Sequence, residues 1–270
     1  MNSDFNSQGY VLVKNLLQKE IINEIILEIH SIFKHKFESD HFHYNNQSNG
    51  LITSEDLVRY YSFNKEGYIG CMRIAQRIPI FFQLASSKKI LDLIKDLGLK
   101  RPVISQEPIL MLNNQKTSRA TGDWKTPLHQ DWRSRQGSLN SVTMWIGLVD
   151  ITPELGPVEI IPGSHLKGLL PIEDDEWFLR VKKDYVNESE FVSMPVKAGD
   201  AMIFSHFLLH QSGTNQTDNF RYSLQFRYDD ILEPTFMHRN YPNSRGTLST
   251  KELITPNFPS LEEIENTFKN

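Results

Sequence analysis

From about residue 103 onward the chain consists of short apolar runs separated by Pro, Gly, Asn and Asp, and this pattern most restricts its fold. Short runs rich in β-branched and aromatic residues and bounded by turn residues are typical of strands, and several in succession favour a sandwich or barrel. Eight such runs are present, the number that a double-sheet jelly roll needs. The predicted strands are 103–112, 126–131, 141–149, 157–161, 191–196, 201–204, 208–212 and 221–229.

The first 100 residues carry helical patterns instead. Residues 17–36 predict an amphipathic helix, because apolar side chains recur there at helical spacing. Residues 87–97 predict another, with Ser87 as its N-cap and Gly98 as its C-terminal cap, whereas the polar residues 37–50 predict a loop. The apolar face of the first helix comprises Ile21, Ile22, Ile25, Ile26, Ile29 and Phe33.

Helices followed by strands predict an α+β fold. We expect one domain over residues 1–270, with a mainly helical layer (1–100) packed on one sheet of a jelly-roll, or double-stranded β-helix, core (101–230). Residues 231–270 would form a C-terminal extension. A length of 270 residues suits a single domain with a full core.

Composition narrows the classes of partner. The formal charge of −4 and the scattered basic residues argue against a nucleic-acid partner. No run of 18 apolar residues predicts a membrane span, and the first residues lack the features of a secretion signal. The only cysteine, Cys71, excludes an intramolecular disulfide, so we expect a cytoplasmic protein. Oligomeric state is not predicted.

Two predicted strands separate polar from apolar side chains by parity. One interpretation directs both polar faces into the lumen of a barrel and packs the apolar faces on helices or on the second sheet. The alternative is a one-sided sheet whose polar face meets water. The polar faces comprise Arg221, Ser223, Gln225 and Arg227 in one run and Ser141, Thr143, Trp145 and Gly147 in the other.

The sequence His129-Gln130-Asp131, with His210 far downstream, supplies two imidazoles and one carboxylate. This ligand set is typical of a non-haem Fe(II) site that keeps coordination positions open. Side chains two residues apart share a face of an extended segment, so His129 and Asp131 can converge while Gln130 points away. A His-x-Asp step alone is weak evidence, and its value depends on the surrounding sequence.

The stretch from Leu128 to Tyr228 resembles the phytanoyl-CoA dioxygenase family of Fe(II)- and 2-oxoglutarate-dependent oxygenases, which includes ectoine hydroxylase and non-haem halogenases. The resemblance covers about 100 residues and is only loose over residues 1–100. The motifs that carry it are LHQDW (128–132), TPELGPVEIIPGSHLKG (152–168) and AGDAMIFSHFLLHQSGTNQTDNFRYSLQFRY (198–228).

The resemblance implies that His129, Asp131 and His210 bind the iron. His210 is favoured over His206 because it begins the family pattern H-x-S-x-x-N-x5-R, which ends at Arg221. His165, in the Pro-Gly-Ser-His element, is expected to bind backbone groups.

For 2-oxoglutarate, the resemblance implies that Arg221 binds the distal carboxylate, for which a planar guanidinium is a natural bidentate partner. Ser212 would donate a hydrogen bond to the same carboxylate. Trp145 and Asn113 resemble further positions of the cosubstrate pocket.

The resemblance also implies a reaction. The family's halogenases carry a small residue where this chain has Asp131, so we expect hydroxylation or a related oxidation, with 2-oxoglutarate and O2 converted to succinate and CO2. Candidate substrate contacts are Trp132, Arg133 and Arg135, together with the loops 113–126 and 41–50. They suggest a small polar or acidic metabolite, a sugar or a natural-product intermediate, although an ordinary solvated loop would explain the same residues.

Two other classes stay open at this point. A cupin-like sugar-binding or metal-storage module could use the same barrel without oxygen chemistry, and a zinc hydrolase or isomerase could use the same three ligands. Neither class explains an arginine eleven residues after the metal histidine.

Overall fold

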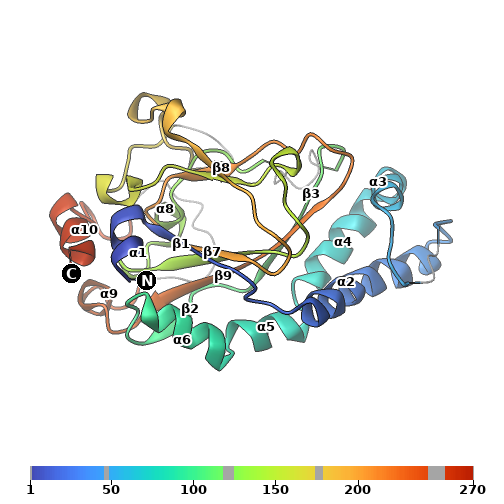
Figure 1. Cartoon of the computed structure of the whole chain (residues 1–270), viewed down its shortest axis with the longest axis horizontal. Coiled ribbons are helices and arrows are strands. Elements are labelled where there is room, and N and C mark those ends of the chain that lie inside the picture. Colours follow the sequence, from blue (N-terminus) through green and yellow to red (C-terminus); the bar gives the residue numbers. More distant parts are fainter. Residues whose placement is uncertain (1, 46–48, 118–124, 174–178, 243–252, 270) are drawn as a thin grey trace.

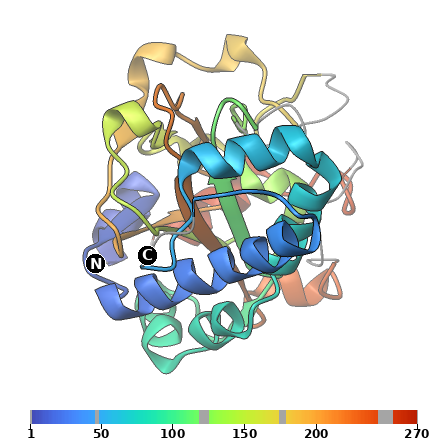
Figure 2. The same cartoon turned by 90° about the vertical axis from the view of Figure 1, so that its right-hand side faces the viewer.

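The computed structural model describes residues 2–45, 49–117, 125–173, 179–242 and 253–269. Two antiparallel sheets form the centre of the molecule, and helices from the first 100 residues cover the outer face of the larger one (Figure 1). Figure 2 shows these helices in front of the strands. The predicted α+β fold with a jelly-roll core is confirmed. Among the described residues, no helix is long and apolar enough to cross a membrane.

The predicted helix 17–36 is confirmed as α2 (Lys19–Ser39), which buries Ile25, Ile29 and Phe33. The predicted helix 87–97 is confirmed as α6 (Lys88–Asp96); the Ser87 side chain accepts a hydrogen bond from the Ile90 amide, and Gly98 has a φ of 110°. The sequence did not predict five other elements before residue 90. They are α1 (Asn2–Gln8), β1 (Tyr10–Val13), α3 (Ser54–Phe63), α4 (Lys65–Ala75) and α5 (Pro79–Ala85).

The larger sheet has the strand order β1-β7-β4-β9-β2, with β3 also paired to β9, and the smaller sheet has the order β6-β5-β8. Both sheets are antiparallel throughout the described pairings. The strands after β1 are β2 (Pro102–Ile104), β3 (Ile109–Asn113), β4 (Val142–Gly147), β5 (Val158–Ile160), β6 (Val192–Met194), β7 (Ala201–Ser205), β8 (His210–Ser212) and β9 (Arg221–Asp230).

Two of the eight predicted strands need correction. Residues 103–112 form two strands, β2 and β3, which pair with different halves of β9. Residues 126–131 are not a strand: a single bridge joins His129 to His210, and helix α8 (Asp131–Arg135) begins at Asp131. The other six predictions coincide with β4 to β9.

The parity of the two central strands is confirmed, with the polar faces directed into the lumen. The apolar residues of β4 and β9, among them Met144 and Phe226, pack in one core with Ile25 and Phe33 of α2. The opposite faces meet the smaller sheet, where Trp145 packs with Val158 and Ile160. The polar side chains on this inner face are largely buried, so the alternative of a water-facing sheet is wrong. The buried ones are Ser141, Thr143, Arg221, Ser223 and Arg227.

The C-terminal residues, which include α9 (Pro234–His238) and α10 (Leu261–Phe268), pack against α8 and the short helix η2 (Ser164–Lys167). Phe258 lies against Trp132 of α8, with ring centroids 5.9 Å apart. Arg239 donates hydrogen bonds to the carbonyls of Gln136 and Gly137, which immediately follow α8. This segment therefore holds the helix that begins with Asp131.

Candidate metal and cosubstrate site

His129, Asp131 and His210 are positioned by one short backbone pairing. The amide of each histidine donates a hydrogen bond to the carbonyl of the other, at 3.0 and 3.2 Å. Gln130 keeps an extended conformation, and the chain turns into α8 at Asp131. The sequence had suggested that a strand of period two presents the carboxylate. The structure shows instead that Asp131 is the first residue of a helix.

The Gln130 side chain points away from the two histidines, as predicted. Its amide nitrogen donates to the carbonyls of Gly168 and Phe207, and its oxygen accepts from the Leu170 amide. Since the side chain is buried and saturated, it ties the segment between the candidate ligands to two neighbouring loops.

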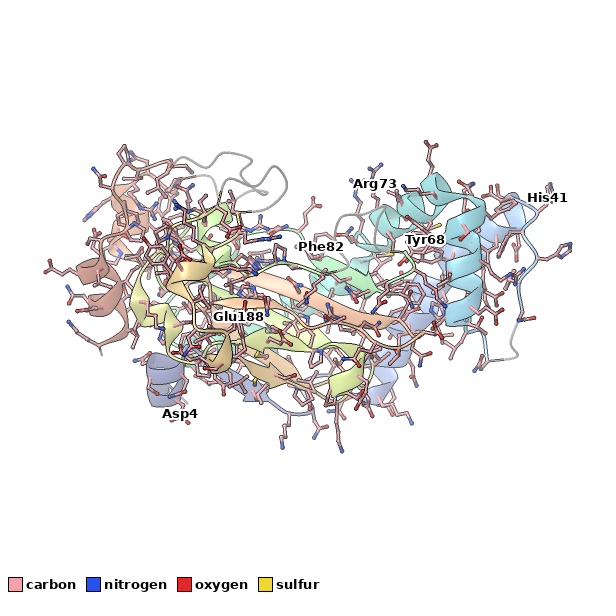
Figure 3. The ribbon with its side chains drawn as sticks, turned by 90° about the horizontal axis from the view of Figure 1, so that it is seen from above. Asp4, His41, Tyr68, Arg73, Phe82 and Glu188 are labelled. Atoms are coloured by element: carbon pink, nitrogen blue, oxygen red, sulfur yellow. The ribbon has the colours of Figure 1, made fainter. Side chains whose placement is uncertain are left out.

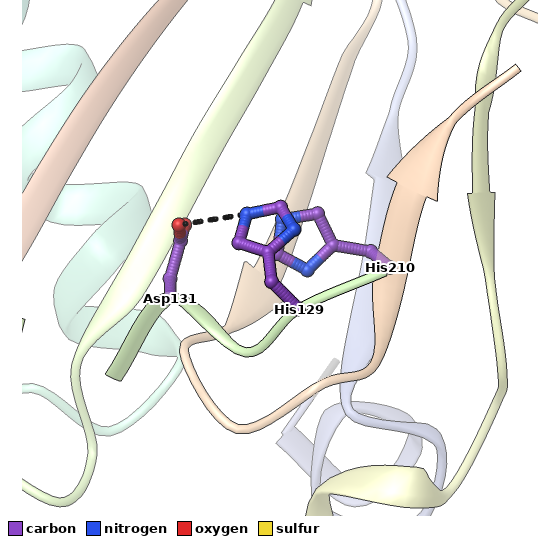
Figure 4. Close-up of side chains that lie close together, drawn as sticks. All are labelled: His129, Asp131 and His210. Carbon is purple, nitrogen blue, oxygen red and sulfur yellow. Dashed lines mark ion pairs between the residues drawn. The ribbon is translucent and has the colours of Figure 1, made fainter. Parts of the chain in front are cut away.

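The three predicted ligand side chains converge (Figure 4). One ligand atom from each of them lies within 4.8 Å of the other two. The Nε2 of His129 is 3.4 Å from an Asp131 oxygen, and the two imidazole centroids are 4.1 Å apart. Asp131 and His210 are buried, and His129 is half-buried. Two imidazole nitrogens and one carboxylate oxygen at this spacing fit a divalent transition metal.

Each histidine has its Nδ1 bound to a backbone carbonyl. The Nδ1 of His129 lies 2.8 Å from the Pro127 oxygen, and that of His210 lies 2.9 Å from the Leu208 oxygen. A carbonyl can only accept, so these contacts place the proton on Nδ1 and leave the Nε2 lone pair for a metal. Burial, followed by the charge of His129, lowers the pKa of His210 to about 3, which keeps this imidazole neutral.

Asp131 is held by two lumen side chains. Thr143 donates a hydrogen bond of 2.6 Å to Oδ2, and Arg227 contacts both carboxylate oxygens at 3.3 Å. Burial alone would raise the pKa of Asp131, but the Arg227 charge and the His129 contact hold it well below its usual range. The carboxylate is therefore ionised and fixed in orientation, as metal binding requires.

A buried cation lies on the same strand as Arg227, six residues earlier. Arg221 is 1% exposed, donates to the Gly156 carbonyl, and has Nη2 3.4 Å from the Ser212 hydroxyl. Its register partner across β3 and β9 is Asn113. Arg221 Nε and both polar atoms of the Asn113 side chain have no hydrogen-bond partner within the described parts of the chain.

Burial lowers the pKa of Arg221 to about 10, so the guanidinium is still charged at neutral pH. No carboxylate among the described residues forms an ion pair with it. A buried guanidinium with a free donor, next to a hydroxyl and an unpaired amide, fits an external carboxylate. The structure thus brings together three of the four predicted cosubstrate residues: Arg221, Ser212 and Asn113.

The remaining predicted residues occupy varied environments. Trp145, the fourth cosubstrate position, packs in the core between the sheets, and its role stays a prediction. Trp132 stacks on Phe207 with centroids 5.3 Å apart, and Arg133 is half-buried. Arg135 is buried. Residues 118–124 of the predicted substrate loop 113–126 and residues 46–48 of the loop 41–50 lie outside the described residues.

The two rejected histidines are both buried. His165 Nε2 lies 3.0 Å from the Asn6 carbonyl, the backbone contact that the sequence predicted. His206 is not part of the three-ligand cluster.

Sequence reasoning missed Thr143 and Arg227 as partners of Asp131. Both were placed on the polar faces of their strands, but only the register, in which Thr143 lies opposite Arg227, shows that they meet at the carboxylate.

Comparison with known proteins finds several relatives that carry the name phytanoyl-CoA dioxygenase. Over 265 residues the chain is 23% identical to a probable phytanoyl-CoA dioxygenase of Caenorhabditis elegans, an alignment that covers 93% of this chain and 78% of the relative. Over 294 residues it is 27% identical to phytanoyl-CoA dioxygenase domain-containing protein 1 of Danio rerio, and this alignment covers 93% of this chain and 96% of the relative.

Among solved structures, the chain is similar to the epimerase SnoN, crystallised with Fe3+, alpha ketoglutarate and nogalamycin RO. The TM-score is 0.55 at 21% identity, covering 85% of this chain and 82% of that chain, which supports a common fold. The model of the phytanoyl-CoA dioxygenase (PhyH) family matches residues 5–223, most of the chain. The protein therefore belongs to the phytanoyl-CoA dioxygenase family and is a 2-oxoglutarate-dependent non-haem iron dioxygenase.

Proposed function

We propose that the protein hydroxylates a small polar metabolite, sugar or natural-product intermediate, consuming O2 and 2-oxoglutarate and releasing succinate and CO2. The observation that carries this proposal is the convergence of His129, Asp131 and His210 within 4.8 Å in the lumen that also buries Arg221. A cupin-like binding module or a metal-dependent isomerase would have no use for that arginine.

His129 and His210 would hold the iron through Nε2, and Asp131 through the oxygen that faces His129. Bound iron supplies activation of O2, coupled to decarboxylation of 2-oxoglutarate, for oxidation of an unactivated C–H bond. The chain's own residues fix the ligands: backbone carbonyls set the histidine tautomers, and Thr143 and Arg227 orient the carboxylate.

Arg221 would bind the distal carboxylate of 2-oxoglutarate. Its unpaired Nε and its Nη2, which has only the long contact to Ser212, offer two donors to that carboxylate. Ser212 is two residues after His210, so its hydroxyl comes from the same short strand as a metal ligand. The unpaired Asn113 amide adds a further donor on the neighbouring strand, and the role of Trp145 in this pocket is part of the same proposal.

Asp131 favours hydroxylation over halogenation. Three protein ligands, rather than the two of the family's halogenases, would leave a bound metal with no spare position for a halide. Thr143 and Arg227 restrain the carboxylate, so it cannot swing away to admit a halide.

Trp132, Arg133 and Arg135 are the substrate-contact candidates, since α8 starts at a metal ligand. The single, buried Cys71 supports a cytoplasmic location.

The experiment is an anaerobic Fe(II) titration followed by succinate measurement. His129→Ala, Asp131→Ala and His210→Ala should each lose iron binding and 2-oxoglutarate turnover. The matched control is His238→Ala, because His238 is an exposed imidazole on α9. Full iron binding by any of the three variants would remove that residue from the ligand set. A metabolite screen that monitors succinate formation would then identify the substrate.

A further inference from the structure

Helix α8 brings a second charged side chain to the metal site. Arg135 follows Asp131 by four residues, which places both on one face of the helix. Asp131 is nevertheless bound by Thr143 and Arg227, and no ion pair joins it to Arg135. Arg135 is only 4% exposed, and its Nε and Nη1 have no hydrogen-bond partner in the parts of the chain that the structure describes.

Two further groups near Arg135 also have unpaired nitrogens. They are Nη1 of Arg227 and both ring nitrogens of His206, again with respect to the described residues. Both lie against α8: the Trp132 amide donates a hydrogen bond to the His206 carbonyl, and Arg227 contacts Asp131. Burial lowers the pKa of His206 to about 3; Asp131 opposes this shift, and Arg227 and Arg135 add to it. Burial, followed by the Arg227 charge, lowers the pKa of Arg135 to about 10, while the charges of Asp131 and Asp229 oppose this shift. We call Arg135, His206 and Arg227 the Arg135 cluster.

Asp229, a buried carboxylate on the lumen face of β9, contributes negative charge near Arg135 but forms no ion pair with it. It accepts hydrogen bonds from the Ser138 amide and hydroxyl. Among the described residues, the lumen face and α8 thus hold three buried guanidinium groups, Arg135, Arg221 and Arg227, against two buried carboxylates, Asp131 and Asp229. A divalent metal and the dianion 2-oxoglutarate cancel each other, so one positive charge is left without a counterion.

Unpaired buried donors of this kind are rare in native proteins, because each one costs free energy comparable to a lost hydrogen bond. Water could satisfy the N–H groups, but it would leave the charge uncompensated in a low-dielectric site. An anion satisfies both requirements. The donors are also rigid and planar, which suits an oxyanion.

The cluster is separate from the proposed 2-oxoglutarate contact. Arg221 and Arg227 are six residues apart on the same face of β9, a separation of roughly 20 Å for an extended strand. Arg221 contacts Ser212 near His210, whereas Arg227 contacts Asp131. The candidate metal ligands therefore lie between the two cationic ends.

We propose that the Arg135 cluster binds an oxyanion of the substrate, so that the enzyme acts on a small carboxylate or phosphonate held beside the metal. This inference rests on the proposed oxygenase function, since it takes the opposite end of the lumen as the 2-oxoglutarate site. The anion would place a neighbouring C–H bond of the substrate next to the metal.

The test uses thermal unfolding of the full chain loaded with Ni(II), which does not turn over, and saturated with 2-oxoglutarate. The probes are two matched pairs: methylphosphonate with dimethyl methylphosphonate, and butyrate with butyramide. Sodium chloride at equal ionic strength is the reference. A ligand that binds only the folded state raises Tm, so the anionic member of each pair should stabilise the protein and the neutral member should not.

Arg135→Gln should weaken anion binding roughly 10- to 100-fold, the loss expected for one charge-assisted contact. Arg135→Lys should retain part of it. Arg73→Gln removes an equal charge from the exposed face of α4 and should behave as wild type (Figure 3). Since Arg135 has unpaired donors, Arg135→Gln should fold without loss of Tm in the absence of anions.

Equal Tm shifts from charged and neutral probes would overturn the proposal. So would equal anion affinity in wild type and Arg135→Gln, or no shift by either anion at ~50 mM, well above the millimolar dissociation constant expected of such contacts. These outcomes are separable from a failure of the oxygenase proposal, because that failure would appear earlier, as absence of Ni(II) or 2-oxoglutarate binding in wild type.

Discussion

Replacing Arg221 tests the cosubstrate assignment most directly. Arg221→Gln removes the charge and the two donors available to a carboxylate, Nε and Nη2. Truncating one partner of a buried, hydrogen-bonded charge pair costs about 2–5 kcal/mol. The dissociation constant for 2-oxoglutarate should therefore rise roughly 30- to 5000-fold. Arg221→Lys keeps the charge but not the planar guanidinium, so its dissociation constant for 2-oxoglutarate should lie between those of wild type and Arg221→Gln.

The assay is calorimetric titration of 2-oxoglutarate into the anaerobic Fe(II) protein, with iron affinity measured separately. Iron affinity should change little, because Arg221 contacts none of the three candidate ligand side chains. Arg73→Gln, on the exposed surface of α4, is the matched control for loss of one positive charge. If wild type and Arg221→Gln bound 2-oxoglutarate equally well, Arg221 would have no part in the cosubstrate site.

Three other predictions follow from the same geometry. Thr143→Val removes the 2.6 Å hydrogen bond to Asp131 and should weaken iron binding about 10- to 100-fold in a competition titration, with unchanged affinity contradicting the role of Thr143. Burial raises the pKa of Asp229 from 3.8 to about 6. The free energy of unfolding should therefore fall as pH rises from 4 through 6, and above pH 6 the ionised group should cost about 3 kcal/mol. Asp229→Asn keeps an acceptor for the Ser138 donors, and the gain in unfolding free energy measured in urea should be larger at pH 8 than at pH 5; a gain independent of pH would show that Asp229 does not titrate in this range. With its natural substrate, the enzyme should yield an oxygenated or desaturated product at any chloride concentration, and a chlorinated product in mass spectrometry would contradict the assignment of Asp131 as a ligand.

Local periodicity explains what could be predicted from the sequence. Helices α2 and α6 were predictable because their apolar residues recur at helical spacing, and α6 has recognisable caps. The two faces of β4 and β9 were predictable because alternation in a strand is independent of its neighbours. The three candidate ligands and Arg221 were found through the family motif, whose residues do come together.

Tertiary contacts explain what was missed. Residues 103–112 look like one strand, but Pro108 lacks an amide hydrogen and the chain changes partner position along β9 before continuing as β3. Residues 126–131 look extended, but Asp131 starts a helix whose end is held by Arg239 and by the contact of Phe258 with Trp132. Those partners are more than 100 residues away, beyond the reach of any local pattern.

Strand β9 sets the geometry of the whole candidate site. Its period of two puts Arg221 and Arg227 on the lumen face, while Tyr222, Leu224 and Phe226 anchor the opposite face in the core shared with the N-terminal helices. Because a shift of one residue would exchange the two faces, the packing against α2 fixes the register that directs both guanidinium groups inward. The helical layer, which contributes none of the candidate metal ligands, thus determines where the two cationic ends of the lumen lie.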